Sequence, residues 1–436
     1  MLKSLLILTL FRVAFVGDPQ ADNATQVYYA QRSVFRELRE RKDIDLVVVL
    51  GDLVNDEPEL IGPMAASLDS LACPWVAVPG NHDRDVYKGE KGRARDVATW
   101  RREVGYVDTA FVLGGIRFIL MNDVRTKGTA DYEAGLSAGQ KAWLAARLAA
   151  TPPSQLAVIA THIPLTEMHA RDSLEALLSG HRLLLVSGHT HQVRRETLTL
   201  GGGHLSPGSL TLGSQLALSH AAAGASGEPA VESLVAGASC GSWWRGFKDA
   251  LGIPDALMNC GSPRGYFVAD FSAPDARDGS VSYRLRWHTL TAGRGPVRSS
   301  QRLSGSSHTG RRISFSDSQA SVTATDSTLI VNVFGGHLDG TVKIKGIDRA
   351  QSSGRWLTLV RRHLIAPEVE ERIAFNSSMT REYRKEHQEE YIPMRRLASP
   401  HVWAADVPDA ASLRGRKVTV IYSDGHMSFR TRLTVR

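Results

Sequence analysis

Six short apolar runs between residues 12 and 186 constrain the fold of this chain more than any other feature of its sequence. In order, the runs are RVAFV, DLVVVL, PWVAVP, IRFILM, LAVIA and RLLLV. Short, mainly apolar runs of this kind are typical of strands that are buried on both faces. Because stretches with helical spacing separate the runs, the pattern predicts an α/β fold in which helices cover layered sheets.

Three of the intervening stretches carry helix signals. Residues 25–42 place apolar side chains on one stripe. Residues 137–150 open with the Ser-x-x-Gln spacing of a capping box, and residues 171–180 end in a glycine, a common helix stop. The charged segment 84–106 interrupts this rhythm, and we expect it to form a surface excursion.

The length of 436 residues exceeds what one hydrophobic core usually supports and predicts two domains. Residues 201–227 are rich in Gly, Ser, Leu and Ala and read as turns, with short strands left open as an alternative. From about residue 262 the chain consists of β-like pieces such as GYFVADF and KVTVIYSD. They predict an antiparallel β-sandwich or a small barrel. We therefore divide the chain into residues 1–261 and a smaller β-rich domain, residues 262–436.

The formal net charge of +7 gives weak support for an anionic ligand. Since no Lys/Arg block with interleaved aromatic residues occurs, we do not expect dedicated nucleic-acid binding. The three cysteines are too few and too widely spread for a disulfide framework or a zinc finger. Buried or incidental thiols are expected, and a bridge between Cys240 and Cys260 is the alternative.

The amino-terminal segment MLKSLLILTLF has the positive charge and the apolar stretch of a secretory signal, but no small-residue cleavage site precedes Arg12. The apolar stretch is also shorter than the roughly 20 residues that span a bilayer, so no transmembrane segment is expected. The compartment stays open between the cytoplasm and, if the true start lies upstream, the periplasm or the exterior.

Side chains that bind metal ions follow five of the six apolar runs. They are Asp18 and Gln20 after the first run, Asp52 after the second, Asn81 and His82 after the third, His162 after the fifth, and His189 and His191 after the sixth. Several stand directly behind a glycine, which lets the backbone turn tightly. Because ligands of open α/β sheets bind beyond the carboxyl ends of the strands, we expect these groups at one edge.

Oxygen and imidazole ligands without thiolate favour Mn, Fe, Zn or Mg. Without His82, the seven remaining side chains are too many for one open catalytic ion. A pair of ions about 3.5 to 4 Å apart that shares one carboxylate would use them all, and such pairs bind the attacking and leaving oxygens in phosphoryl transfer. The pattern therefore predicts two divalent metal ions.

The blocks D-x-[H/Q], GDxx[D/N], GNH[D/E], a single His and GHxH occur in this order within residues 12–191. This series resembles the calcineurin-like metallophosphoesterase family, which implies a layered, αββα-like sandwich. The tail from CGSWWRGF onward is similar to bacterial members that carry their own C-terminal domain. The resemblance leaves the substrate open.

The resemblance also implies roles for the individual residues. One metal ion would be bound by Asp18, Gln20, Asp52 and His191, and the other by Asp52, Asn81, His162 and His189, with Asp52 shared. A water or hydroxide shared between the ions would be the nucleophile. His82, next to Asn81, would contact the scissile phosphate and protonate the leaving oxygen or stabilise the charge of the phosphate.

Two positions depart from the common family pattern. Gln20 stands where many members have a histidine, and this predicts weaker binding of the first ion. Asn55 stands where the protein phosphatases of the family have an aspartate that orients the catalytic histidine. We therefore expect a less basic His82 and no protein phosphatase activity.

The predicted function is hydrolysis of a phosphomonoester or phosphodiester, with a phosphorylated small molecule or lipid as the substrate. One alternative is a pyrophosphatase of nucleotide or lipid diphosphates, in which residues 201–227 shelter a lipid. Another is a metal-binding scaffold without activity, against which the intact Asn81 and His82 argue. Trp243 and Trp244 are expected to pack the tail against the first domain, and lining a substrate pocket is their alternative role. Arg84 belongs to a charged run that is usually a solvated face, with phosphate binding as the alternative.

Overall fold

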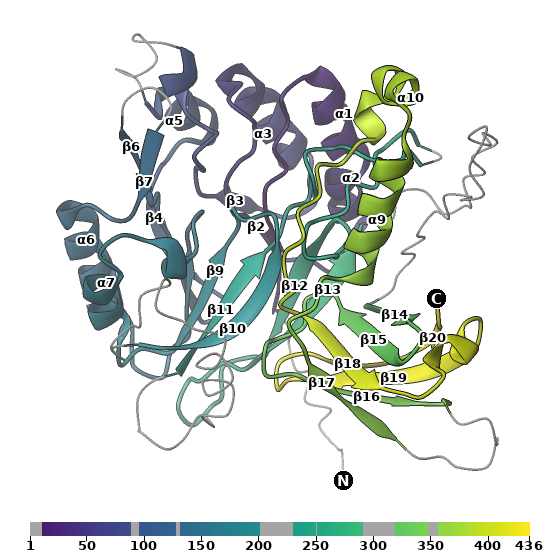
Figure 1. The fold of residues 1–436 in the computed structure, drawn as a ribbon. Helices are drawn as coiled ribbons and strands as arrows, with labels where there is room; N and C mark the ends of the chain where they lie inside the picture. Colours follow the sequence, from purple (N-terminus) through teal and green to yellow (C-terminus); the bar gives the residue numbers. More distant parts are fainter. Residues whose placement is uncertain are drawn as a thin grey trace.

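The computed structural model describes residues 11–88, 96–127, 131–200, 230–249, 251–290, 319–347 and 356–436. The signal-like amino-terminal segment before residue 11 and the Gly-rich stretch 201–227, on which the lipid alternative rests, lie outside the described residues. Within the described part, helices and strands form one layered α/β unit and a second, β-rich unit beside it (Figure 1).

The first sheet has the strand order β13-β12-β1-β2-β3. Its strands are β1 (Phe11–Val16), β2 (Leu46–Val49), β3 (Trp75–Ala77), β12 (Gly265–Phe271) and β13 (Tyr283–Thr289). β1, β2 and β3 run parallel, and β12 pairs antiparallel with β1. The first three apolar runs of the sequence thus form neighbouring parallel strands.

The second sheet has the order β10-β11-β9-β8-β5-β4. Its strands are β4 (Thr109–Leu113), β5 (Ile116–Leu120), β8 (Ala157–Ala160), β9 (Leu183–Ser187), β10 (Val193–Thr199) and β11 (Ala230–Ala236). β5, β8 and β9 are parallel and correspond to the last three apolar runs. A short hairpin of β6 (Val124–Lys127) and β7 (Asp131–Ala134) follows β5.

The two sheets face each other, and helices cover their outer faces (Figure 1). Phe118 and Leu120 of β5 share a core with the first sheet, whereas Ile119 packs into a second core with the helices α6 (Ala138–Ala149) and α7 (Arg171–Leu178). The opposite outer layer consists of α1 (Ala24–Arg32), α2 (Val34–Glu40), α3 (Ile61–Asp69) and α5 (Ala98–Val104). The expected αββα-like sandwich is confirmed.

Two local predictions differ from the structure. The helix expected over residues 25–42 is broken at Ser33, whose hydroxyl donates to the carbonyl of Tyr29 at 2.6 Å and whose ψ of −95° leaves the helical range. In the segment 84–106, Arg84 does not lie on a solvated face, since it is buried, as is Trp100, whereas Arg101 and Arg102 are exposed. The Arg84 guanidinium donates to Asp96 at 2.9 Å and to the carbonyl of Val124 at 2.7 Å, so it is part of the packing.

The C-terminal part contains a seven-stranded antiparallel sheet with the order β14-β15-β18-β17-β16-β19-β20. Its strands are β14 (Ala320–Ala324), β15 (Thr328–Val333), β16 (Thr341–Lys345), β17 (Leu357–Arg361), β18 (Val402–Asp406), β19 (Lys417–Ser423) and β20 (Ser428–Thr434). The edges meet, because the backbone N–H of Ala324 donates to Arg436 O at 2.9 Å and that of Arg436 to Val322 O at 3.0 Å. The sheet therefore closes on itself around its own core.

β12 and β13 lie beyond residue 261 and yet belong to the first sheet. The sequence analysis groups them with the C-terminal strands, because the pattern of a strand does not reveal which sheet it joins. The strands from β14 onward form the separate C-terminal sheet. The helices α9 (Pro367–Ser378) and α10 (Arg381–Glu386), which the sequence analysis does not predict, rise from this sheet towards α1 and α2 (Figure 1).

Candidate metal centre

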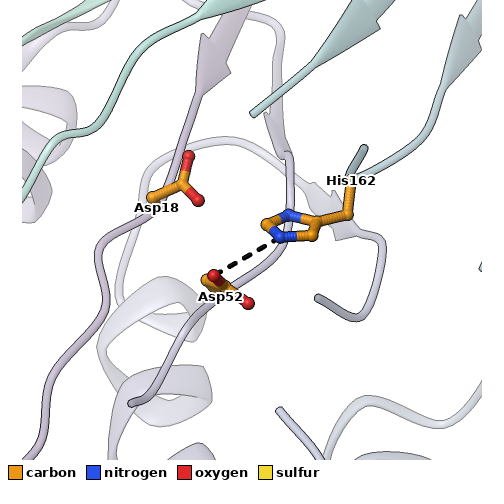
Figure 2. Close-up of side chains that lie close together, drawn as sticks. All are labelled: Asp18, Asp52 and His162. Atoms are coloured by element: carbon orange, nitrogen blue, oxygen red, sulfur yellow. Dashed lines mark ion pairs between the residues drawn. The ribbon is translucent and has the colours of Figure 1, made fainter. Parts of the chain in front are cut away.

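The five predicted ligand blocks meet where the carboxyl ends of the parallel strands of both sheets adjoin. Loops after β1, β2 and β3 carry the candidate residues from Asp18 to His82, and loops after β8 and β9 carry the remaining histidines. Asp18, Asp52 and His162 come within 4.8 Å of one another, measured between potential ligand atoms (Figure 2). The site thus lies at the junction of the two sheets. This agrees with the rule that ligands of α/β sheets bind beyond the carboxyl ends of the strands.

His162 is the centre of the tighter group of donors. Its Nδ1 donates to the carbonyl of Leu50 at 2.8 Å, so Nε2 is the nitrogen that can bind a cation once its proton has been displaced. Three further polar atoms surround Nε2. They are Asn81 Oδ1 at 3.0 Å, His189 Nδ1 at 3.2 Å and Asp52 Oδ2 at 3.3 Å. Four electron-pair donors that face one another at these distances fit a shared cation, and they are the set that the resemblance assigns to one ion.

The second group of donors is more open. His191 donates from Nδ1 to Gly241 O at 2.7 Å, and its Nε2 lies 4.0 Å from Asp18 Oδ1. The Asp18 carboxylate accepts the backbone N–H of His189 at 3.0 Å. Gln20 turns its amide nitrogen towards Asp52 at 3.4 Å, so ligation through its oxygen would require rotation of the amide.

The electrostatics of both groups favour a positive charge between them. Burial lowers the pKa of His162, but Asp52 and Asp18 outweigh this effect and raise it to about 10. Burial raises the pKa of Asp18, whereas His162 and His82 hold that of Asp52 below its usual range despite burial. Burial lowers the pKa values of His189 and His191 to about 3 and 4, so both rings are neutral at pH 7, the form that binds metal ions.

The backbone is strained at most of these positions. Five of the seven candidate ligands have a positive φ, with values from 35° to 71°: Asp18, Gln20, Asp52, His189 and His191. Residues other than glycine rarely adopt a positive φ, and each one that does costs of order 1–3 kcal/mol of folding free energy. Strain of this kind persists where the surrounding structure imposes it, and it is concentrated at functional sites.

The glycines of the ligand blocks serve mainly to make room. A Cβ on Gly80 would lie 2.0 Å from Asp52 Oδ1, and one on Gly188 would lie 2.5 Å from Asp18 Oδ2. Gly51 combines a φ of +90° with a Cβ position 2.4 Å from His162 Nδ1. The expectation that these glycines permit tight turns therefore holds for Gly51, while Gly80 and Gly188 let the ligands pack against the backbone.

His82 has a carboxylate partner, contrary to the expectation drawn from Asn55. Its Nδ1 donates to Asp56 Oδ1 at 2.7 Å, and its backbone N–H donates to Asp52 Oδ1 at 3.0 Å. Burial lowers the pKa of His82, but Asp52 and Asp56 raise it to about 9. The predicted loss of basicity is wrong, because the residue after Asn55 takes over the contact.

Comparisons with known proteins agree with this geometry. Residues 11–193 match the model of the family described as calcineurin-like phosphoesterase, and residues 233–427 match that described as the C terminal of calcineurin-like phosphoesterase. The chain belongs to the calcineurin-like phosphoesterase family. No curated protein matches it significantly. Among solved structures it is similar to Vps29 of Chaetomium thermophilum, with 11% identity, 66% of this chain and 100% of that chain covered, and a TM-score of 0.24.

Membership of this family supports metal-dependent hydrolysis of phosphate esters as the general activity. Across the residues that the structure describes, no helix has the length and apolar character needed to cross a membrane. Cys240 and Cys260 are both free and buried, so the alternative of a bridge between them is not borne out.

The second family match includes a loop, residues 238–246, that closes the more open side of the metal centre. The N–H of Ser239 donates to Gly17 O at 2.7 Å, and that of Cys240 donates to Asp18 O at 3.1 Å. Trp244 is buried and donates from Nε1 to Pro19 O at 2.9 Å, in agreement with the expected packing role. Trp243 differs, since it is 40% exposed and stacks on His191.

Sequence reasoning missed two buried aspartates that hold the ligand loops. Asp83 accepts the N–H groups of Gly80 and Val54 at 2.8 and 3.0 Å. Asp123 accepts the N–H of His162 at 3.0 Å and that of the next residue at 2.8 Å. A signal for Asp123 existed, because it follows the apolar run IRFILM, the one run to which no ligand was assigned.

Proposed function

We propose that this protein hydrolyses phosphomonoesters or phosphodiesters with two divalent metal ions bound at the junction of its sheets. The observation that carries the proposal is the convergence of Asn81 Oδ1, His189 Nδ1 and Asp52 Oδ2 on His162 Nε2 at 3.0 to 3.3 Å. A protonated His162 has a single Nε2 proton to share among these groups, whereas a metal ion that replaces this proton can bind all four.

The residues divide between the two ions as the family resemblance implies. Asp18, Gln20, Asp52 and His191 would hold one ion, and Asp52, Asn81, His162 and His189 the other. The ions, Mn, Fe, Zn or Mg, would acidify a water molecule shared between them and polarise the phosphate oxygens. The carbonyls of Leu50 and Gly241 accept from Nδ1 of His162 and His191, so Nε2 of each ring is the atom that would hold an ion.

His82 is the proposed proton donor to the leaving oxygen. Asp56 holds Nδ1, so the proton to be transferred is the one on Nε2. Asp52 and Asp56 raise the pKa of His82 against the effect of burial, which favours the protonated ring that a general acid requires. Because the ring is half-buried at the edge of the site, it can meet a substrate that Asn81 also contacts.

Metal reconstitution tests the function. The protein is stripped of metal, reloaded separately with Mn, Fe, Zn or Mg, and assayed with 4-nitrophenyl phosphate and bis(4-nitrophenyl) phosphate. We expect hydrolysis of at least one ester with at least one metal. Binding of two equivalents of metal without hydrolysis of either ester, or of nucleoside diphosphates, would indicate the inactive scaffold. Hydrolysis of the diphosphates alone would indicate the pyrophosphatase.

A further inference from the structure

A large aromatic side chain stands exposed at the edge of the metal centre. The ring of Trp243 lies 4.6 Å from that of the candidate ligand His191, centroid to centroid, with the planes at 26°. The residue is nevertheless 40% exposed. An indole that stacks on a candidate metal ligand and is still 40% exposed can accept a second planar group on its exposed part.

The surrounding loop holds this indole in a fixed place. Trp243 and Trp244 both have positive φ values, 52° and 55°. Gly241 has a φ of +60°, and a Cβ there would lie 1.8 Å from Ala256 O. The hydroxyl of Ser242 donates to Leu257 O at 2.6 Å, so the loop is fixed on both sides of the exposed ring.

Neighbouring elements add to this fixation. The Arg264 guanidinium lies 5.1 Å from the ring of Trp244, and the ring of Tyr29 on α1 packs on the other side at 5.9 Å. The N–H of Gly246 donates to Glu389 O at 2.7 Å, which ties the end of the loop to the C-terminal part. A ring presented by a rigid loop loses little conformational entropy when a ligand stacks on it.

Support of His191 does not by itself require an exposed indole. The orientation of this ring is already set by the hydrogen bond from Nδ1 to Gly241 O at 2.7 Å. Two consecutive tryptophans in the left-handed region cost of order 1–3 kcal/mol each, and such residues are concentrated at functional sites. The exposed part of Trp243 is therefore a candidate for contact with a ligand.

We propose that Trp243 is a specificity-determining residue that stacks on a planar aromatic group of the substrate. This group belongs to the part of the substrate whose phosphate ester bond is hydrolysed at the metal centre. The preferred substrates are then nucleotides or aryl phosphate esters rather than sugar or alkyl phosphates. This inference rests on the proposed function for the position of the phosphate. Stacking tolerates any base, since every base presents a π-face.

Substrate pairs in which both leaving groups are primary alcohols, and only one of them carries an aromatic ring, test the inference. Adenosine 5′-phosphate is compared with ribose 5-phosphate, and benzyl phosphate with ethyl phosphate, as monoesters or as their methyl diesters. For wild type we expect the aromatic member of at least one pair to have the higher kcat/KM. Trp243→Ala should lower this selectivity ratio about 5- to 150-fold, the range that base–aromatic stacking gives. Preference in the first pair alone points to a nucleobase, and preference in both points to any aryl group.

Two further variants separate stacking from structural support. Trp243→Phe keeps a ring and should retain most of the ratio. Trp356→Ala removes a partly exposed tryptophan beside Lys345 in the C-terminal sheet and should leave the ratio unchanged. If Trp243 only supports His191, Trp243→Ala will lower kcat/KM for both members of a pair equally and reduce bound metal, which would overturn the inference.

A binding measurement keeps this inference distinct from the proposed function. Calorimetry of the full-length protein with adenosine 5′-phosphate and with ribose 5-phosphate should show tighter binding of the nucleotide, and Trp243→Ala should abolish the difference. Equal affinities for wild type contradict the inference even if both esters are hydrolysed. A preference for the nucleotide without hydrolysis contradicts the proposed function alone.

Discussion

The two groups of donors at the metal centre are built differently. The group around His162 consists of side chains from strand ends within residues 50–189, packed at 3.0 to 3.3 Å. The group around His191 has a 4.0 Å separation from Asp18 and depends on the loop 238–246 for its orientation. One group is therefore assembled by the first family match alone, while the other needs the segment that belongs to the second.

We therefore expect the two proposed ions to differ in affinity. The group around His162 should bind its ion more tightly and keep it longer, since its donors are buried and already converge. The group around His191 has the neutral amide of Gln20 and a more open geometry. A substitution at the proposed shared ligand should affect both groups, whereas a substitution at His162 or His191 should affect mainly one.

The largest effect is expected at Asp52, the ligand common to both groups. Asp52→Asn removes the charge that both ions share, so both should be lost and kcat/KM should fall by about 10³-fold or more. Elemental analysis of the purified variant measures the metal. Asp326→Asn, at an exposed position of the C-terminal part, serves as the control and should change neither quantity. Retention of two ions by Asp52→Asn would exclude a bridging role.

His82 belongs to neither group, so His82→Ala should separate proton transfer from metal binding. We expect a loss of about 10²-fold in kcat with two ions still bound, because general acid catalysis contributes about this much. Asp56→Asn should have a smaller effect in the same direction. His363→Ala, at an exposed site, is the matched control. Metal loss in His82→Ala equal to that in Asp52→Asn would mean that His82 is a ligand.

A matched pair of histidine substitutions tests the inequality of the ions. His191→Asn should weaken one ion by about 10- to 100-fold and leave the other in place, whereas His162→Asn should weaken the ion of the tighter group. Metal titrations followed by calorimetry give the number of sites and their affinities. Identical losses in the two variants would show that the ions bind as one cooperative unit.

The smallest effect is expected at the loop itself. Gly241→Ala places a Cβ against Ala256 O at a φ of +60° and should lower the free energy of unfolding by about 2 kcal/mol, together with the affinity of the His191 ion. Gly425→Ala provides the comparison, since its φ is +88° but its Cβ meets nothing within 4 Å. It should cost about 1 kcal/mol and leave the metal unaffected. Equal effects of both variants on metal affinity would argue against a role of the loop.

The sequence predicts the part of this molecule that depends on local pattern. All six apolar runs form parallel strands. The ligand blocks that follow five of these runs come together because the carboxyl ends of parallel strands lie at one edge of a sheet. The orientation within a loop is less local. Asp56, which has a φ of 65°, contacts His82. The spacing of these residues in the sequence does not predict this contact.

Contacts between distant segments were beyond the reach of sequence patterns. β12 and β13 read as strands, but their place beside β1 depends on which edge is open after the first sheet forms. The two tryptophans of the loop have similar sequence surroundings and opposite exposure, since Pro19 offers a carbonyl to Trp244 and His191 offers a ring to Trp243. Such partners are decided by tertiary packing.

The pairing of β1 with β12 has a consequence for biosynthesis. The ribosome adds about 5–20 residues per second, so the first strand waits on the order of tens of seconds for the partner that covers its open edge. During this time the edge of β1 that later pairs with β12 is open to chaperones and to premature aggregation. Because the loop 238–246 supplies the carbonyl that orients His191, the proposed ion at His191 would be loaded only after this loop has been synthesised.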